Sequence, residues 1–581
     1  MWALEVTDQQ AYRPPTQAWV AQVLEGDSAV SWAELEAAAL TAAFRAETQN
    51  RTQAMEGWLL VARWSRLLGT SQRVITDRWV NAINTAKLGH ANMAPVNLAP
   101  DEPLSALISS ACAIELVSNA EFSESFFNLL TPYDFLPRVL RIIDGIYRAD
   151  PSTFRRYEQL ALAIAVVFDV VPPPDWPHGQ VSPRALPRGR PSSGDVFAFW
   201  VESDTKRRTL HRLESLEASE LKFVVCAAAP LAELRWVQQR LDFDFNALPR
   251  AYDAVEYRTD RAEQSVYLWP NSSYTLPVIL ELGGICIDQG YFASEAGKAR
   301  GVPTLLFRGA GLDGRHAWFG YLDAQKKWQF DVGRYAEQKL VSGIAFDPQT
   351  WGDVNDHELA FLAERFRLLP TFNQSRARQY LAEEQIRLGE FAAAEKSARR
   401  AVNFEPRNVQ AWEGMIMAQE LGGVALVKRE ATLREAARAF QNYPDLNLRF
   451  MRTVIAVMRA RGQISAAEHE ERLLARQLST DRSDLAIAQA AELLTRTMAQ
   501  DDAPTQLRVF ENALRQFGVN GGMEAFDRLV SPMFKQTLTE KRWNDAKVIL
   551  AIARRWLPIE PESQFEREMQ LLDHQLERAA R

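Results

Sequence analysis

Seven prolines fall within residues 172–191, and this run constrains the fold more than any other part of the sequence. Proline lacks a backbone N–H and fixes φ, so it interrupts helices and central strands alike. We therefore expect an extended linker over 172–194 that separates two folded parts of the chain. The prolines are Pro172, Pro173, Pro174, Pro177, Pro183, Pro187 and Pro191.

The segment before this linker has a helical pattern. Residues 1–171 are rich in Ala, Leu, Glu and Arg, with apolar residues three and four positions apart. Ser31 and Glu34 have the spacing of a capping box, in which each side chain bonds the other's backbone N–H. A stripe of Trp32, Leu35 and Ala39 follows. We predict a helical domain over 1–171.

The segment after the linker mixes two patterns, which predicts an α+β domain over 195–350. Short apolar runs bounded by turn residues indicate strands, and longer runs with a helical period indicate helices. We expect strands at 195–201, 304–307, 316–322 and 328–332, a hairpin turn at 323–326, and helices at 232–241 and within 276–300.

The rest of the chain, 351–581, is predicted to be helical. Gly389 can allow a tight turn, Ala394 and Ala401 are small enough for close helix crossing, and Pro406 can end a helix. Together with Trp412 these positions resemble a tetratricopeptide repeat, a helix–turn–helix unit that stacks into a solenoid. Such a region could bind a protein partner.

Composition excludes several classes of function. The 581-residue chain has a formal net charge of −7 and no run of five basic residues, so nucleic acid is not a favoured partner. No apolar stretch approaches the roughly 18 residues of a membrane span. The N-terminus lacks the basic start and apolar core of a secretion signal, so we expect a cytoplasmic protein, or an exported one if a leader has been removed. Three cysteines without a CxxC pair predict neither a disulfide framework nor a zinc site, and no metal or cofactor is expected.

One cysteine lies in a pattern that suggests catalysis. Cys286 follows Gly283 and Gly284 and opens a predicted helix, where the partial positive charge of the helix end lowers a thiol pKa. His316 lies in a predicted strand, and Asp331 lies in the next one. If these strands pair, Asp331 can orient His316, which can accept the thiol proton. Cys112 and Cys226 sit in apolar runs and are expected to be buried, and the other histidines to be structural or exposed.

The motifs Gly-Ile-Cys286, His316-Ala-Trp318 and Trp-Gln-Phe-Asp331 resemble the transglutaminase-like superfamily. The resemblance covers about residues 230–335 and implies a papain-like core with Cys286 as nucleophile, His316 as base and Asp331 as orienting acid. Trp318 would be a packing residue. The residues after Cys286, and Val332-Gly333 after Asp331, depart from common family patterns, which leaves the substrate class open.

Two functions follow from these observations. In the first, a thioester forms on Cys286 from a peptide or amide substrate; resolution by water makes a protease or amidase, which we favour, and resolution by an amine makes a transglutaminase. In the second, the core is a non-catalytic binding platform and the C-terminal helices bind a protein partner. The oxyanion hole would use the Cys286 N–H and a second donor chosen among Tyr257, Trp269 and Asn271. The glycine-rich stretch 309–314 is expected to be a flexible loop beside the site.

Overall fold

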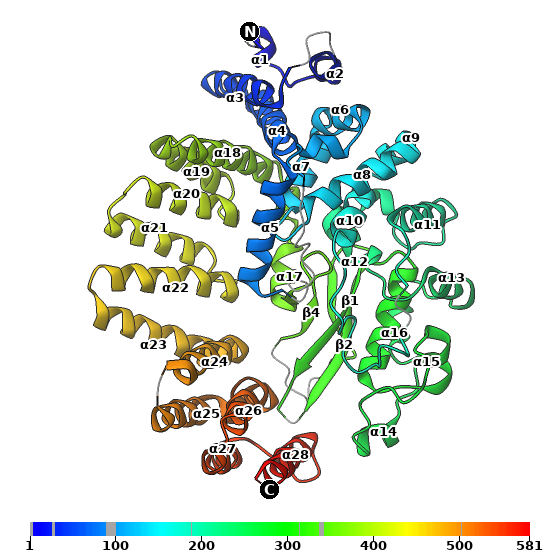
Figure 1. Ribbon diagram of the computed structural model, residues 1–581, viewed down its shortest axis with the longest axis vertical. Coiled ribbons are helices and arrows are strands. Elements are labelled where there is room, and N and C mark those ends of the chain that lie inside the picture. Colours follow the sequence, from blue (N-terminus) through cyan, green and yellow to red (C-terminus); the bar gives the residue numbers. More distant parts are fainter. Residues whose placement is uncertain are drawn as a thin grey trace.

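A computed structural model describes residues 4–25, 30–88, 100–186, 189–312, 314–335, 342–500 and 502–580. It is mostly helical, with a small antiparallel sheet in the middle of the chain (Figure 1). The helical N-terminal and C-terminal parts and the mixed central part match the coarse prediction.

The N-terminal part is helical as predicted, and the Ser31–Glu34 capping box is present at the start of α3. Ser31 Oγ accepts from the Glu34 N–H at 3.2 Å, and the Ser31 N–H donates to Glu34 at 3.0 Å. The helices are α1 (Asp8–Ala11), α2 (Gln17–Glu25), α3 (Trp32–Thr48), α4 (Thr52–Gly69), α5 (Gln72–Ala86), α6 (Ser110–Ser118), α7 (Ala120–Leu129), α8 (Leu136–Ala149), α9 (Pro151–Arg156) and α10 (Glu158–Phe168).

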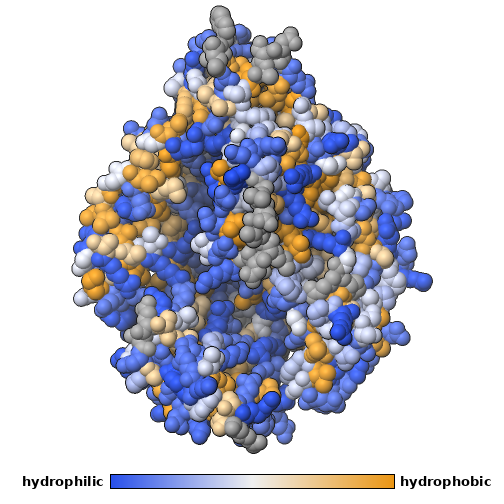
Figure 2. Space-filling view, in the orientation of Figure 1, coloured by the Kyte–Doolittle hydropathy of each residue, from blue (hydrophilic) through white to orange (hydrophobic). Residues whose placement is uncertain are grey.

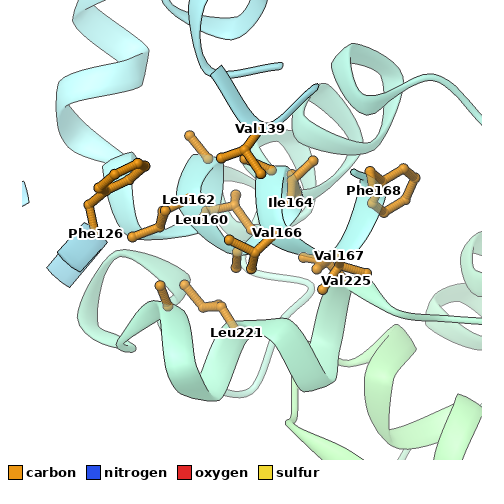
Figure 3. Packing of buried hydrophobic residues seen from close by; sticks show 14 of the residues in the cluster. Phe126, Val139, Leu160, Leu162, Ile164, Val166, Val167, Phe168, Leu221 and Val225 are labelled. Atoms are coloured by element: carbon orange, nitrogen blue, oxygen red, sulfur yellow. The ribbon is translucent and has the colours of Figure 1, made fainter. Parts of the chain in front are cut away.

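Helix α10 lies at the centre of the larger hydrophobic core (Figure 3). Its residues from Leu160 to Val167 are fully buried, which explains an apolar run too continuous for a surface helix. Val139 of α8 and Leu221 of α12 (Ala218–Val225) pack against it. The same core continues into the sheet, because it also contains Phe307 and Trp318. The N-terminal helices and the central sheet therefore contribute side chains to one hydrophobic core.

The described residues of the proline-rich segment form turns and bends and pack closely against the core. His178, Val181 and Leu186 are buried. The Trp269 N–H donates to the Gln180 carbonyl and the Tyr274 N–H donates to the Ala185 carbonyl, each at 2.8 Å. Residues of this segment therefore form part of the core. The domain division at 172–194 itself stays a prediction.

The strand expected at 195–201 is wrong, because these residues lie in helix α11 (Ser193–Thr205). Ser192 caps this helix by accepting from the Asp195 N–H at 3.1 Å. A short apolar run is too short for its periodicity to distinguish a strand from a helix. Here the Ser192 N-cap favours the helix. The helix expected at 232–241 is present as α13 (Leu231–Arg240). Helices α14 (Thr259–Glu263), α15 (Leu276–Leu282) and α16 (Cys286–Ala299) follow, the last two within the predicted 276–300.

The sheet has the strand order β3-β2-β1-β4-β5, and its described pairings are antiparallel. The three strands predicted after residue 300 and their hairpin turn are confirmed, with the Lys326 N–H donating to the Asp323 carbonyl. Helix α16 packs on β1 and β2. The strands are β1 (Thr304–Ala310), β2 (Arg315–Leu322), β3 (Trp328–Val332), β4 (Ile344–Phe346) and β5 (Asp353–Asn355).

The C-terminal part is helical as predicted, and the turn predicted at Gly389 is present. Gly389 takes a φ of +79° between α18 and α19, and Ala394 and Ala401 are fully buried. The helices are α17 (Asp356–Leu362), α18 (Pro370–Arg387), α19 (Phe391–Phe404), α20 (Val409–Leu421), α21 (Leu426–Ala439), α22 (Pro444–Ala460), α23 (Ile464–Asp481), α24 (Ser483–Gln500), α25 (Ala503–Ala525), α26 (Ser531–Thr539), α27 (Trp543–Trp556) and α28 (Gln564–Ala579).

These C-terminal helices curve around the central sheet, from α18 near the N-terminal helices to α28 below the β1–β2 hairpin (Figure 1). At the first end, Arg66 of α4 forms a double hydrogen bond with Glu384 of α18, both distances being 2.6 Å. The surface is hollowed between the curved helices and the sheet (Figure 2). Within the described ranges, no helix is both long enough and apolar enough to cross a membrane.

Candidate functional site

Cys286 is the first residue of α16, as predicted, and two glycines shape the chain before it. Gly283 takes a φ of +71°, which strains any other residue. A Cβ on Gly284 would lie 2.4 Å from the Cβ of Asp288, so only glycine fits there. The Asp288 carboxylate accepts from the Ile285 N–H at 2.9 Å and fixes the first turn of the helix. Cys286 is partly exposed.

The thiol of Cys286 lies beside the backbone of strand β2 at Ala317. The backbone N–H groups of Ala317, Ile287 and Cys286 itself lie near enough to the sulfur to lower the pKa of the thiol. The Ala317 side chain packs with Ile285 and Ile287 at the start of α16. The helix start and the strand therefore touch at the residue after His316.

His316 is buried on β2, and its ring is held by a backbone carbonyl. Its Nε2 lies 2.5 Å from the Gly333 oxygen. A carbonyl oxygen only accepts, so Nε2 carries the proton and Nδ1 of the neutral ring is the acceptor. Burial lowers the pKa of His316, and the Gly333 carbonyl partly opposes this. Within the described residues, no hydrogen bond joins the His316 ring to the Cys286 thiol.

Asp331 does not lie beside His316. Its carboxylate accepts from Arg334 at 2.9 Å, and its side chain is 69% exposed. The reason is the register of the hairpin: Leu322 pairs with Trp328, and Phe319 pairs with Val332. Asp331 therefore lies near Phe319, three residues from His316, which is about 10 Å along a strand. The Gly333 carbonyl occupies the orienting position expected for Asp331.

Burial affects the pKa of Cys286 more strongly than the partial positive charge at the N-terminus of α16 does. The pKa of Cys286 is raised to about 11, first because the thiol is surrounded by protein, although the Ala317 N–H lowers it. The charge of Asp288 raises it further. The lowered pKa expected from the helix N-terminus is thus wrong for this geometry. Cys286 and His316 are both neutral at pH 7.

Three tyrosines surround the site, and the motif analysis gave them no role beyond Tyr257 as a possible donor. Tyr252 donates to the Ala317 carbonyl at 2.8 Å, and its ring lies against Gly333 so closely that a Cβ there would come within 2.7 Å. The Tyr335 ring centroid lies 5.3 Å from that of His316. The pKa values of Tyr252, Tyr257 and Tyr335 are raised, mainly by burial and also by the neighbouring Cys286. Tyr257 forms a β-bridge with Gly284, so it also lies beside the start of α16.

A buried polar chain supports the start of α16 from behind. Asp288 pairs with Arg261 at 2.8 Å and accepts from the Tyr274 hydroxyl at 3.0 Å. Tyr274 Oη lies 2.8 Å from Nε2 of His178, whose pKa burial lowers to about 3. These residues fix the first turn of the helix from its buried side.

The other predicted residues are placed as follows. Trp318 is fully buried and donates to the Phe330 carbonyl at 2.7 Å, which confirms its packing role. Cys112 and Cys226 are buried as expected. Trp269 is buried and donates its Nε1–H to the Ser273 carbonyl, which leaves Tyr257 and Asn271 as candidate oxyanion donors. Of these, Tyr257 is bridged to Gly284, two residues before Cys286. No group of three metal-ligating side chains occurs in the described part of the chain.

Comparison with known proteins adds nothing to the resemblance seen in the sequence motifs. No family model matches this chain. No curated protein and no solved structure matches it either. The function of this protein must therefore be inferred from the residues and geometry of the candidate site.

Proposed function

We propose that this protein carries out cysteine-dependent acyl chemistry on peptide or amide substrates, with Cys286 as nucleophile and His316 as base. The observation that carries the proposal is the packing of Cys286 against the cluster that contains Ala317, because it holds the thiol next to the residue that follows the base on β2. The resemblance to the transglutaminase-like superfamily and its papain-like core supports the same assignment.

The resting site is neutral, so the proposed reaction begins with proton transfer and not with a stored thiolate. A turn of the His316 side chain toward the thiol would bring Nδ1 into reach of the Cys286 proton, and the Gly333 carbonyl would stabilise the imidazolium that forms. The thiolate would attack the substrate carbonyl and form a thioester. The N–H groups at the start of α16 are candidate donors to the developing oxyanion, with Tyr257 beside them.

Water is the favoured acceptor for the thioester, which makes the protein a protease or amidase. No side chain among the described residues around Cys286 forms an evident amine site. The curved C-terminal helices would present a protein substrate to the hollow that Figure 2 shows.

A second candidate is a non-catalytic scaffold with a protein partner on the C-terminal helices. Two observations favour it: the raised pKa of Cys286, and the Asp331 carboxylate that pairs with Arg334 and not with His316. The enzyme and the scaffold make opposite predictions: an acyl donor should modify Cys286 in the enzyme and should not do so in the scaffold.

The test uses p-nitrophenyl acetate as an acyl donor, with peptide mass spectrometry to locate the acetyl group. We expect acetylation of Cys286 in the wild type and a loss of at least about 100-fold in His316→Ala, the range for removal of a general base. Cys112→Ala is the matched control and should match the wild type. Equal acetylation in wild type and His316→Ala, or none at Cys286, would reject the enzyme and leave the scaffold.

A further inference from the structure

The tip of the β1–β2 hairpin is held by the C-terminal helices. The Met523 N–H of α25 donates to the Gly311 carbonyl at 2.9 Å, and the Arg315 N–H donates to Gln564 Oε1 of α28 at 2.8 Å. We call these contacts, together with the ion pairs of Arg315, the hairpin clasp. The stretch expected to be a flexible loop is thus anchored at Gly311 and Leu312, while residue 313 lies outside the described residues.

Arg315 makes the strongest contacts of the clasp. Its guanidinium bonds both oxygens of Asp527, at 2.9 and 2.5 Å, and bonds Glu568 at 2.7 Å. Two-point contact between guanidinium and carboxylate fixes direction as well as distance. These acidic partners raise the pKa of Arg315. One side chain therefore ties the sheet to a turn after α25 and to α28.

The backbone that carries Asp527, a partner of Arg315, departs from regular α-helix at two places. Gly522 interrupts α25 with φ +47° and ψ −124°, and a Cβ there would lie 2.4 Å from the Leu312 carbonyl oxygen. The next segment, Phe526–Val530, is a π-helix turn that carries Asp527. Such turns are rare and often mark functional positions. The kink lets the hairpin approach, and the turn brings Asp527 to Arg315.

The clasp holds the strand position next to the candidate base. Arg315 directly precedes His316, and it pairs with Ala310 at the end of the hairpin. His316 pairs with Gly309, and Ala317, one residue further, meets the Cys286 sulfur. Figure 1 shows the hairpin extending toward α26 and α28. A shift at the tip would therefore move His316 and the Ala317 N–H relative to α16.

The geometry points to Arg315 as a positioning residue: held by Asp527 and Glu568, it fixes the strand that carries His316 against Cys286. This inference rests on the proposed function, since the residue it positions is the proposed base. The C-terminal helices thereby take part in the site without touching the substrate.

The experiment compares wild type, Arg315→Gln, Arg315→Lys and Asp527→Asn in the full chain. Iodoacetamide labelling is followed at each cysteine, and acetylation of Cys286 by p-nitrophenyl acetate is measured in parallel. We expect Arg315→Gln and Asp527→Asn to label Cys286 at least about fivefold faster, because local opening of the hairpin exposes it. Acetylation that depends on His316 should fall by a similar factor. Arg315→Lys keeps the charge but loses the two-point contact, so it should recover only part of both effects.

Cys112 and Cys226 report on unfolding within the same sample, because both are buried away from the clasp. Arg554→Gln is the matched control, since it removes an ion pair with Asp573 between α27 and α28 that does not touch the hairpin. Faster labelling of all three cysteines, or Cys286 labelling and acetylation within twofold of wild type in Arg315→Gln, would overturn the inference. If wild type is not acetylated at Cys286 but the labelling changes as expected, the proposed function fails while the clasp is shown to hold the strand.

Discussion

The His316 ring is held by the carbonyl of Gly333, with 2.5 Å between Nε2 and the oxygen. A backbone atom thus takes the orienting place of the triad carboxylate, but it bonds the other ring nitrogen, so that Nε2 carries the proton and Nδ1 is the acceptor. Gly333 is required there because its φ is +86° and the Tyr252 ring leaves no space for a Cβ. A neutral partner stabilises the imidazolium less than a carboxylate would, so the site depends more on burial and geometry.

The first prediction concerns Asp331. Asp331→Asn should change the acetylation rate of Cys286 by less than about threefold, far below the 10⁴-fold loss seen when the acid of a true triad is removed. The reason is that Asp331 pairs with Arg334 at the surface. Stopped-flow measurement of p-nitrophenol release gives the rate. A loss of a hundredfold or more would show that Asp331 reaches His316 during the reaction.

The second prediction concerns the pH dependence of thiol reactivity. Because the pKa of Cys286 is raised to about 11, the thiolate fraction and the iodoacetamide rate should rise about tenfold per pH unit from 7 to 10. A cysteine in an unfolded peptide would level off near its ordinary pKa of about 8.5. Labelling followed by peptide mass spectrometry measures the curve. A plateau below pH 8 would instead indicate a stable thiolate–imidazolium pair.

The third prediction concerns a partly buried carboxyl pair, Glu56 of α4 and Glu124 of α7. Burial and the neighbouring Glu124 raise the pKa of Glu56 to about 8. The folded protein then binds more protons than the unfolded chain between the unfolded and folded pKa values, so this group lowers the free energy of unfolding as pH rises from about 4.5 to 8. Glu56→Gln should leave stability nearly unchanged at pH 5 and raise it by roughly 1–3 kcal/mol at pH 9, after a discount for partial exposure.

Chemical denaturation at pH 5 and pH 9 measures that difference. Glu468→Gln, the same change at an exposed position on α23, is the control and should give no comparable gain at pH 9. An equal gain for both variants would mean that general charge, and not the buried pair, is responsible.

The fourth prediction concerns the kink in α25. Gly522→Ala should destabilise the protein by more than about 1 kcal/mol, because alanine is strained at positive φ and its Cβ would meet Leu312. Gly414→Ala in α20 is the matched change, since nothing lies within 4 Å of a Cβ there. It should stabilise by about 0.5–1 kcal/mol through helix propensity. Thermal unfolding of both variants gives the comparison, and a neutral Gly522→Ala would contradict the close approach.

Much of the fold could be read from local patterns, because caps, turns and periodicity are local. The Ser31–Glu34 box, the 323–326 turn and the glycine before α19 are confirmed on that basis. The strand prediction for helix α11 is wrong because a short apolar run fits both periods, whereas the Ser192 cap selects the helix. Local patterns were sufficient where one interaction within a few residues decides the structure.

The site needed information that spacing does not carry. Cys286 at a helix start follows from the glycines before it, but its pKa depends on side chains from distant segments, such as Tyr252. The position of Asp331 could have been excluded by counting from the hairpin turn, because a turn that pairs Leu322 with Trp328 places Arg334, and not Asp331, opposite His316. The clasp joins residues more than 200 positions apart, and no short motif records such a contact.

The curved C-terminal helices are attached to the rest of the molecule at both ends, through Glu384 at one end and Asp527 at the other. A chain of helices fixed at two ends cannot change its curvature freely, as a solenoid with one free end can. A ligand that straightens or tightens the middle helices must therefore strain one of the two attachments. Glu384 is 2% exposed, whereas Asp527 is 32% exposed, so the attachment beside His316 is the one that solvent weakens. Mechanical load on these helices is thus transmitted to the strand of the candidate site.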